Sequence, residues 1–144
     1  MELNKLEIPI QLRTVIEENG DKEMNIIKQV GQYVGAKNRE VITFSEDTEL
    51  GEVRNFITLQ DGKVTLKRSG QLTMNQKFIL GERTESIYRH PYGTLHLEIH
   101  TKKMQYDRME QGRKGKVIIQ YDMIINGDHK RRHHLTLIYG GEKE

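Results

Sequence analysis

The sequence predicts an all-β protein in which one antiparallel sheet closes into an up-and-down barrel of eight to ten strands. Apolar and polar residues alternate along almost the whole chain from Glu7 to Tyr139, which is the period of a strand. Short glycine-containing breaks separate the runs, and none leaves room for the helical crossover that parallel strands need. The clearest breaks are Asn19-Gly20, Asp61-Gly62, Ser69-Gly70 and Asn126-Gly127. We prefer a barrel to a two-sheet sandwich because the long runs suit a strongly coiled sheet.

The first two strands are expected over residues 8–18 and 22–34. Asn19-Gly20 between them favours the positive φ angles of a tight hairpin turn. Alternate positions of the second strand make one largely apolar face, and Ile27 interrupts that alternation. The members of this face are Met24, Ile26, Lys28 and Val30. Gly31 indicates a bulge or a strong bend, because a glycine inside a strand commonly marks one.

Four shorter strands follow, separated by tight turns. They are expected over residues 41–45, 52–60, 63–68 and 71–80. Residues 46–51 are expected to form an acidic turn, and the short strand 41–45 with its neighbour is a candidate edge or gap in the sheet. Two polar residues share the apolar faces of their strands, Asn55 with Ile57 and Gln76 with Phe78. These two positions are the first sign of a partly polar interior.

The last four strands are expected over residues 82–89, 94–106, 116–125 and 129–139. His90-Pro91-Tyr92-Gly93 and Asn126-Gly127 are the turns between them. On the apolar faces of these strands lie Thr101, Tyr121 and, in register with Leu135, His133. The whole chain, 1–144, is expected to be a single domain with an ordered core over 7–139. We expect the termini and the charged loop 107–115 to be mobile.

Composition places the chain among ordinary globular proteins. A length of 144 residues, with 35% hydrophobic and 31% charged residues, is enough for one domain with a real core. The absence of cysteine excludes disulfides and cysteine metal sites, and it favours the cytoplasm. No signal-peptide pattern and no apolar stretch of about 18 residues is present, so we expect no membrane span. A net charge of +2 is too small to indicate nucleic acid by itself.

One set of motifs resembles a known family. Its most specific part runs from Arg68-Ser69-Gly70 through Met74-Asn75-Gln76-x-Phe78-x-x-Gly81-x-x-Thr84. The pattern continues with Tyr88, Gly93-x-Leu95, Thr101 and Tyr121-x-Met123. These residues resemble the YwiB-like family of bacterial proteins, and the likeness extends from Ile8-Pro9-Ile10 to Thr136-x-x-Tyr139. The resemblance implies a calycin-like, lipocalin-type β-barrel, and it supplies no activity and no catalytic residues.

Polar residues on the apolar strand faces are the candidate ligand-binding set. The set comprises Asn55, Arg68, Gln76, Thr101, Tyr121 and His133. Polar groups that leave water need hydrogen-bond partners, and a guanidinium offers fixed parallel donors to a carboxylate or another polar head. We therefore predict that the barrel binds a small hydrophobic or amphipathic molecule. The alternative is an internal hydrogen-bond network or contact with solvent at the barrel ends, where Arg68 stands last in its expected strand.

Metal and catalytic chemistry find little support in the sequence. His96 and His100 flank Glu98 on one strand face, but at about 3.3 Å per residue they lie roughly 13 Å apart, too far to share one ion. We interpret this pattern as a solvated polar face. There is no cysteine and no Gly-x-Ser-x-Gly elbow, so we predict no metal, no cofactor and no catalytic residue. An enzyme that uses His133 or Tyr121 is the least supported hypothesis.

The main alternative is a protein- or RNA-interaction module with a fully packed core. It would use two basic hairpins, Arg113-Lys114-Gly115-Lys116 and residues 130–134, because Lys and Arg make most phosphate contacts. Nearby acidic residues dilute that positive field, so nucleic acid is not favoured. The two hypotheses differ in the barrel interior, which is a connected cavity in the first and packed side chains in the second. No feature of the sequence indicates an oligomeric state.

Overall fold

The structure, a computed structural model, describes residues 4–110 and 113–141 as one sheet of ten antiparallel strands. The strands are β1 Asn4–Glu18, β2 Asp21–Ala36, β3 Arg39–Thr48, β4 Gly51–Gln60, β5 Lys63–Gly70, β6 Met74–Ile79, β7 Arg83–His90, β8 Gly93–Asp107, β9 Lys114–Ile125 and β10 His129–Gly140. The predicted all-β antiparallel barrel is confirmed. The outermost residues expected to be mobile, 1–3 and 142–144, and positions 111–112 of the expected mobile loop lie outside the described residues.

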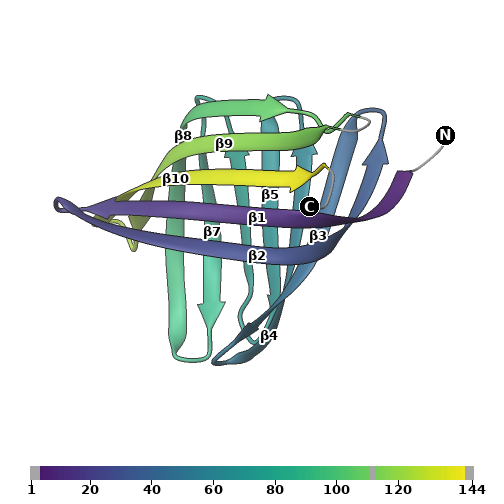
Figure 1. Cartoon of the computed structure of the whole chain (residues 1–144). Helices are drawn as coiled ribbons and strands as arrows, with labels where there is room; N and C mark the ends of the chain where they lie inside the picture. Colours follow the sequence, from purple (N-terminus) through teal and green to yellow (C-terminus); the bar gives the residue numbers. More distant parts are fainter. Residues whose placement is uncertain (1–3, 111–112, 142–144) are drawn as a thin grey trace.

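The strands follow one another around the barrel, and β1 pairs with β10 to join the two ends of the chain. Strands β8, β9, β10, β1 and β2 form a front layer that runs across β3 to β7 behind it (Figure 1). The remaining seam lies between β6 and β7. There, one bridge joins Thr73 and Arg89 by two backbone hydrogen bonds of 2.9 and 2.8 Å. The barrel is therefore nearly closed.

The two strongest turn signals are confirmed. Asn19 and Gly20 have φ angles of 49° and 85°, and Asn126 and Gly127 have φ angles of 51° and 83°, as a two-residue hairpin turn of this type requires.

Several expected strand ends are wrong. Strand β3 extends to Thr48 because β4 continues to pair with it as far as Gly51, so residues 46–48 are not a turn. Strand β5 extends to Gly70, and the loop between β8 and β9 is shorter than 107–115. Strand β3 is not an edge, because β2 and β4 flank it, but a gap beside it is present where β2 and β3 stop pairing beyond Gln32 and Thr43.

The apolar face expected for β2 points away from the barrel. Met24, Ile26 and Val30 are 47–55% exposed, whereas Ile27 packs against the core. The cause is the register with β1, in which Ile27 lies opposite the inward-facing Leu12. Neighbours directly opposite in an antiparallel pair share a face, so the residue that broke the alternation is the one that faces the interior.

Strands β2 and β3 separate at Gly31. They pair only from Gln32 opposite Thr43 to Ala36 opposite Arg39. At Gly31, a Cβ atom would lie 2.5 Å from the carbonyl oxygen of Thr43, so only glycine allows the strands to meet there. Toward Asp21, β2 is paired with β1 alone, and the β1–β2 hairpin extends to the left in Figure 1. The register between β1 and β2 runs through Gly31 without a shift, so Gly31 marks a bend rather than a bulge. The wall of the barrel is open beside it, where β2 and β3 do not pair.

The middle of the barrel is filled with apolar side chains. Leu12, Ile57, Leu59, Val64, Phe78, Val117, Ile119 and Leu137 meet there, all at most 7% exposed. They leave an unfilled volume of only about 10 Å³, which is at the lower limit for a single water molecule. This layer separates the two ends of the interior.

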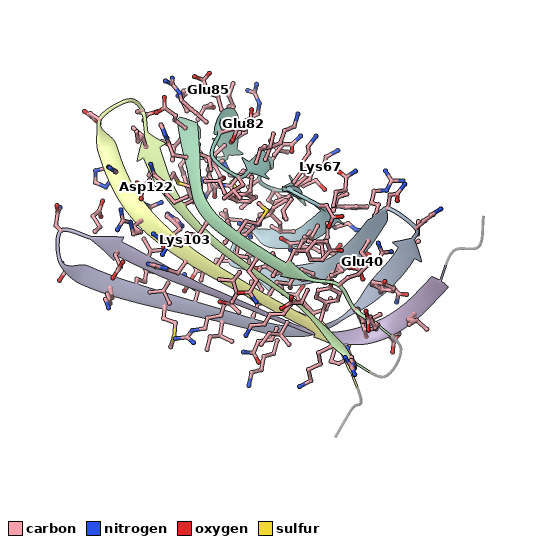
Figure 2. The ribbon with its side chains drawn as sticks, turned by 90° about the horizontal axis from the view of Figure 1, so that it is seen from above. Glu40, Lys67, Glu82, Glu85, Lys103 and Asp122 are labelled. Atoms are coloured by element: carbon pink, nitrogen blue, oxygen red, sulfur yellow. The ribbon has the colours of Figure 1, made fainter. Side chains whose placement is uncertain are left out.

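A buried carboxylate closes one end. Glu40 is 0% exposed and accepts hydrogen bonds from Tyr33 at 2.6 Å, from Tyr139 at 2.7 Å and from Tyr106. Burial raises the pKa of all three phenols, and so does the hydrogen bond to Glu40, so they stay protonated donors. Figure 2 shows Glu40 inside the ring of strands. The tyrosines come from β2, β8 and β10, so one carboxylate ties together strands from both ends of the chain.

We expect Tyr139→Phe to lower the free energy of unfolding by about 1.5–3 kcal/mol, because it removes a hydrogen bond to a buried charged acceptor. Urea unfolding followed by far-UV circular dichroism measures the change. The matched control is Tyr92→Phe, at a side chain that is 87% exposed, where the change should stay within about 0.5 kcal/mol. Equal midpoints for the two variants would show that Glu40 does not need this donor.

Candidate ligand-binding cavity

The end of the barrel opposite Glu40 holds a cavity of about 610 Å³. Its walls are largely apolar, formed by Leu12, Leu66, Met74, Leu97, Met123 and Leu135 among others. The volume lies within the range of pockets that bind small molecules. Asn25 and Ile27 of β2 and Glu46 of β3 also line it, so the cavity reaches the opening where these two strands separate.

Most of the predicted polar set lines this cavity. Asn55, Arg68, Gln76, Tyr121 and His133 are lining residues. Thr101 is buried at 2% exposure but does not line the cavity. Its backbone bonds to the turn between β6 and β7, where the Thr101 oxygen accepts from Gly81 at 3.0 Å. The register of β8 and β9 also shifts just after Thr101. The structure therefore brings together five of the six candidates.

Arg68, Glu46 and Asn55 form one wall of the cavity. Oε1 of Glu46 accepts from Nη2 of Arg68 at 3.1 Å and from Nδ2 of Asn55 at 2.8 Å. Arg68 is 22% exposed, so it takes part in an internal hydrogen-bond network and also keeps partial contact with solvent, as the alternative expectation had it. Sequence reasoning missed Glu46 because it placed the residue in a turn. The signal was its parity with Ile42 and Phe44, both of which face inward.

Tyr121 and His133 form a stacked pair on the opposite wall. Their rings lie 4.8 Å apart at 22°, and the Tyr121 hydroxyl is 3.2 Å from Nδ1 of His133. Burial raises the pKa of Tyr121, so the phenol keeps its proton, and its hydroxyl shares a hydrogen bond with Nδ1 of His133. Burial, followed by the nearby Arg131 charge, lowers the pKa of His133 to about 4. At neutral pH the imidazole is therefore uncharged, and Nε2 is the ring nitrogen that Tyr121 does not occupy.

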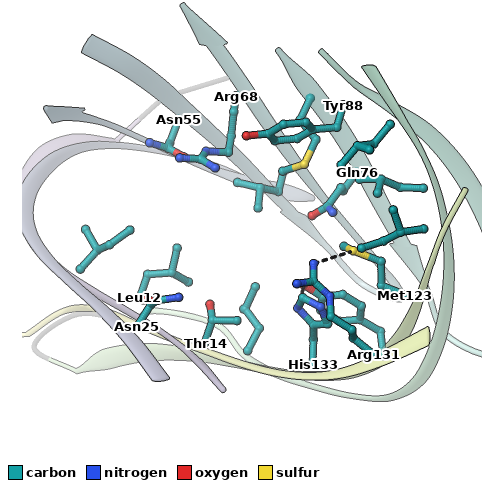
Figure 3. A pocket seen from close by; sticks show the side chains of 18 of the residues that line it. Leu12, Thr14, Asn25, Asn55, Arg68, Gln76, Tyr88, Met123, Arg131 and His133 are labelled. Atoms are coloured by element: carbon teal, nitrogen blue, oxygen red, sulfur yellow. Dashed lines mark hydrogen bonds between the residues drawn. The ribbon is translucent and has the colours of Figure 1, made fainter. Parts of the chain in front are cut away.

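Arg131 is a second cavity residue that the sequence analysis does not place there. The alternative of an interaction module puts it on a basic surface hairpin, but it lines the cavity beside His133 (Figure 3). The alternation along β10 is the signal for it, because Arg131 falls in step with His133, Leu135 and Leu137, which face the interior. Among the described residues, the cavity lining therefore holds two arginines and one acidic residue, Glu46.

The comparisons with known proteins agree with this architecture. The sequence profile of a domain of unknown function, DUF1934, matches residues 10–137. The chain belongs to this family. A relative from Bacillus subtilis (strain 168), the "Uncharacterized beta-barrel protein YwiB", is 34% identical over 139 residues, which cover 95% of this chain and 96% of the relative. The resemblance to YwiB-like proteins that the sequence motifs indicated is thereby confirmed.

A solved structure supports the same relationship. The crystal structure of the ywiB protein from Bacillus subtilis matches with a TM-score of 0.85 at 31% identity, over 96% of this chain and 94% of that one. This chain is therefore related to that protein in sequence, and the two have the same barrel fold. Within residues 4–110 and 113–141, no helix could cross a membrane.

We expect the protein to lose stability as the pH falls from about 6.5 toward 4. A free histidine has a pKa of 6.5 and folded His133 one of about 4, so between these values the unfolded chain binds a proton that the folded chain does not. The full shift corresponds to about 3 kcal/mol at 1.36 kcal/mol per pKa unit. Urea unfolding at several pH values measures the slope.

The variant His133→Gln should flatten that slope, because it removes the titrating imidazole. Leu135→Val changes a neighbouring side chain of the cavity without changing any titrating group, so it should keep the slope. If His133→Gln and the unmodified chain lose stability equally between pH 6.5 and pH 4, the assignment to His133 is wrong.

Proposed function

We propose that this protein binds a small, partly apolar molecule without covalent chemistry, inside the open end of its barrel. The observation that carries the proposal is the cavity of about 610 Å³, whose walls combine apolar side chains with a few polar groups. That combination is typical of small-molecule sites. The opening between β2 and β3 supplies a route for the molecule, because the two strands do not pair beyond Gln32 and Thr43.

The other two hypotheses find less support. An interaction module needed a packed interior and a basic hairpin at residues 130–134, but Arg131 of that hairpin lines the cavity. An enzyme would use the Tyr121–His133 pair. The pKa of Tyr121 is raised and that of His133 is lowered, so both move away from neutrality, where general acids and bases work best. A location in the cytoplasm stays a prediction from the sequence.

A neutral, apolar dye such as Nile red should bind with a stoichiometry of one and gain fluorescence in the cavity. The variant Leu95→Trp should reduce this binding at least tenfold by filling the space, because Leu95 lines the cavity. The matched control is His96→Trp, whose side chain is exposed on the outer face of the same strand. Fluorescence titration of the three proteins measures the effect.

The chain contains no tryptophan, so the introduced indole also reports on its own surroundings. A blue-shifted emission from Leu95→Trp and a water-like emission from His96→Trp would establish that each ring lies where intended. Undiminished dye binding by Leu95→Trp under those conditions would contradict the proposal.

A further inference from the structure

Arg131 carries a charge that the chain does not compensate. Within the described residues it takes part in no ion pair, and its Nη2 reaches the sulfur of Met123 at 3.8 Å. A thioether is a weak acceptor. The Nε atom of Arg131 is buried without a hydrogen-bond partner. Arg131 as a whole is half-buried and lines the open cavity. A guanidinium that is partly withdrawn from water is stabilised by an anion that supplies acceptor oxygens, and the described residues place none beside it.

His133 presents a second unsatisfied donor at the same place. Its side chain is only 5% exposed, it lines the cavity, and its Nε2 is buried without a partner among the described residues. Because Tyr121 occupies Nδ1, Nε2 is the ring nitrogen left to donate a hydrogen bond to a ligand. Arg131 and His133 lie together on one side of the cavity (Figure 3). Two adjacent donors without acceptors form a site for a negatively charged group.

Arg68, on the opposite wall of the cavity, differs from Arg131 because it already has an acidic partner within the protein. Arg68 is 3.1 Å from Glu46, and Asn55 holds the same carboxylate oxygen at 2.8 Å. This wall is therefore neutral as a whole, although the Nε of Arg68 is unsatisfied. Figure 3 shows Asn55 and Arg68 across the cavity from Arg131 and His133. The uncompensated positive charge is thus confined to the side of Arg131.

The net charge of the cavity lining indicates which polar head group the ligand carries. Within residues 4–110 and 113–141, the cavity lining holds two arginines, Arg68 and Arg131, and one acid, Glu46, so this part of the chain gives it one positive charge in excess. A carboxylate carries one negative charge and matches the planar guanidinium fork, whereas a phosphate monoester carries about 1.5 to 2 charges at neutral pH. We propose that the ligand is an apolar carboxylic acid whose carboxylate binds Arg131 and the Nε2–H of His133. This inference rests on the proposed function and names the chemical class of its ligand.

The apolar remainder of the molecule has a defined place. Leu66, Met74 and Leu97 line the same cavity, and burying a methylene group against such side chains contributes about 0.8 kcal/mol. Affinity should therefore increase with the length of the acid until the cavity is filled. A short acid such as acetate should bind far more weakly than decanoate.

Isothermal titration with decanoate, decanol, decyl phosphate and decylamine tests the assignment. The unmodified chain should bind decanoate at least tenfold more tightly than the other three. Arg131→Met should weaken decanoate binding about tenfold to a hundredfold, the usual effect of losing a hydrogen-bonded charge, and should leave decanol unchanged. The matched control, Lys130→Met, removes a positive charge from the residue just before Arg131, whose side chain is 64% exposed. It should leave the affinity for decanoate unchanged.

The ligand-free protein provides a second measurement. Arg131 is half-buried and has no ion-pair partner among the described residues, so Arg131→Met should not lower the melting temperature of the ligand-free protein and should reduce the increase that decanoate produces. Arg131→Lys keeps the charge but loses the planar fork, so its decanoate affinity should be intermediate. It also serves as the test if Arg131→Met does not fold.

The outcomes separate the two proposals. Equal affinity for decanoate and decanol, unchanged in Arg131→Met, overturns the carboxylate assignment and leaves the proposed function intact. Tighter binding of decyl phosphate or decylamine also overturns it, in favour of a phosphate or of a cation held by Glu46. If none of the four compounds binds and Nile red does not bind either, the proposed function itself is wrong.

Discussion

The pairing of β1 with β10 determines which side chains fill this barrel. It places Leu12 opposite Leu137 and Ile16 opposite His133, and it joins residues from the two ends of the chain. Because strand side chains alternate between two faces, a slip of one residue along this pair would move every inward side chain of β1 to the solvent. Such a long-range pairing forms only when the whole meander is in place. The apolar middle layer, the Glu40 cluster and the cavity all depend on this single register.

The polar side chains at the two ends of the barrel differ in whether they have hydrogen-bond partners. At one end, Glu40 receives three tyrosine hydroxyls and is fully satisfied. At the other end, Nε of Arg131 and Nε2 of His133 are buried without hydrogen-bond partners among the described residues. Native proteins satisfy most of their buried polar atoms, so unsatisfied ones mark places where water, an ion or a ligand completes the hydrogen bonding or where strain is stored. The interior is thus closed where Glu40 lies and open where the cavity lies, with the apolar layer between them.

Gly31 stands where strands β2 and β3 separate, and this separation opens the cavity to the outside of the barrel. It lets β2 and β3 approach closely over five pairs, from Gln32 opposite Thr43 to Ala36 opposite Arg39, and then separate. The separated half of β2 is held by β1 alone, and it carries exposed apolar side chains on its outer face. Segments with pairing on one side and little burial are the ones that open most readily in native proteins. The part of the barrel beside the cavity is therefore also the part best able to admit a ligand.

The sequence by itself determined the strands, most of the turns, the antiparallel barrel and the inward direction of Asn55, Gln76, Tyr121 and His133. It could do so because alternation and glycine turns are local signals. Sequence reasoning misplaced Glu46, Arg131 and the apolar face of β2, and it gave no sign of Glu40. The alternation along β3 and β10 already indicates that Glu46 and Arg131 face inward. Only the tertiary structure decided the inward face of β2 and the partners of Glu40, because the first follows from the register with β1 and the second come from three distant strands. The same reason explains why the sequence left open whether the interior is packed or hollow: one half is packed around Leu59 and Ile119, and the other half is a cavity.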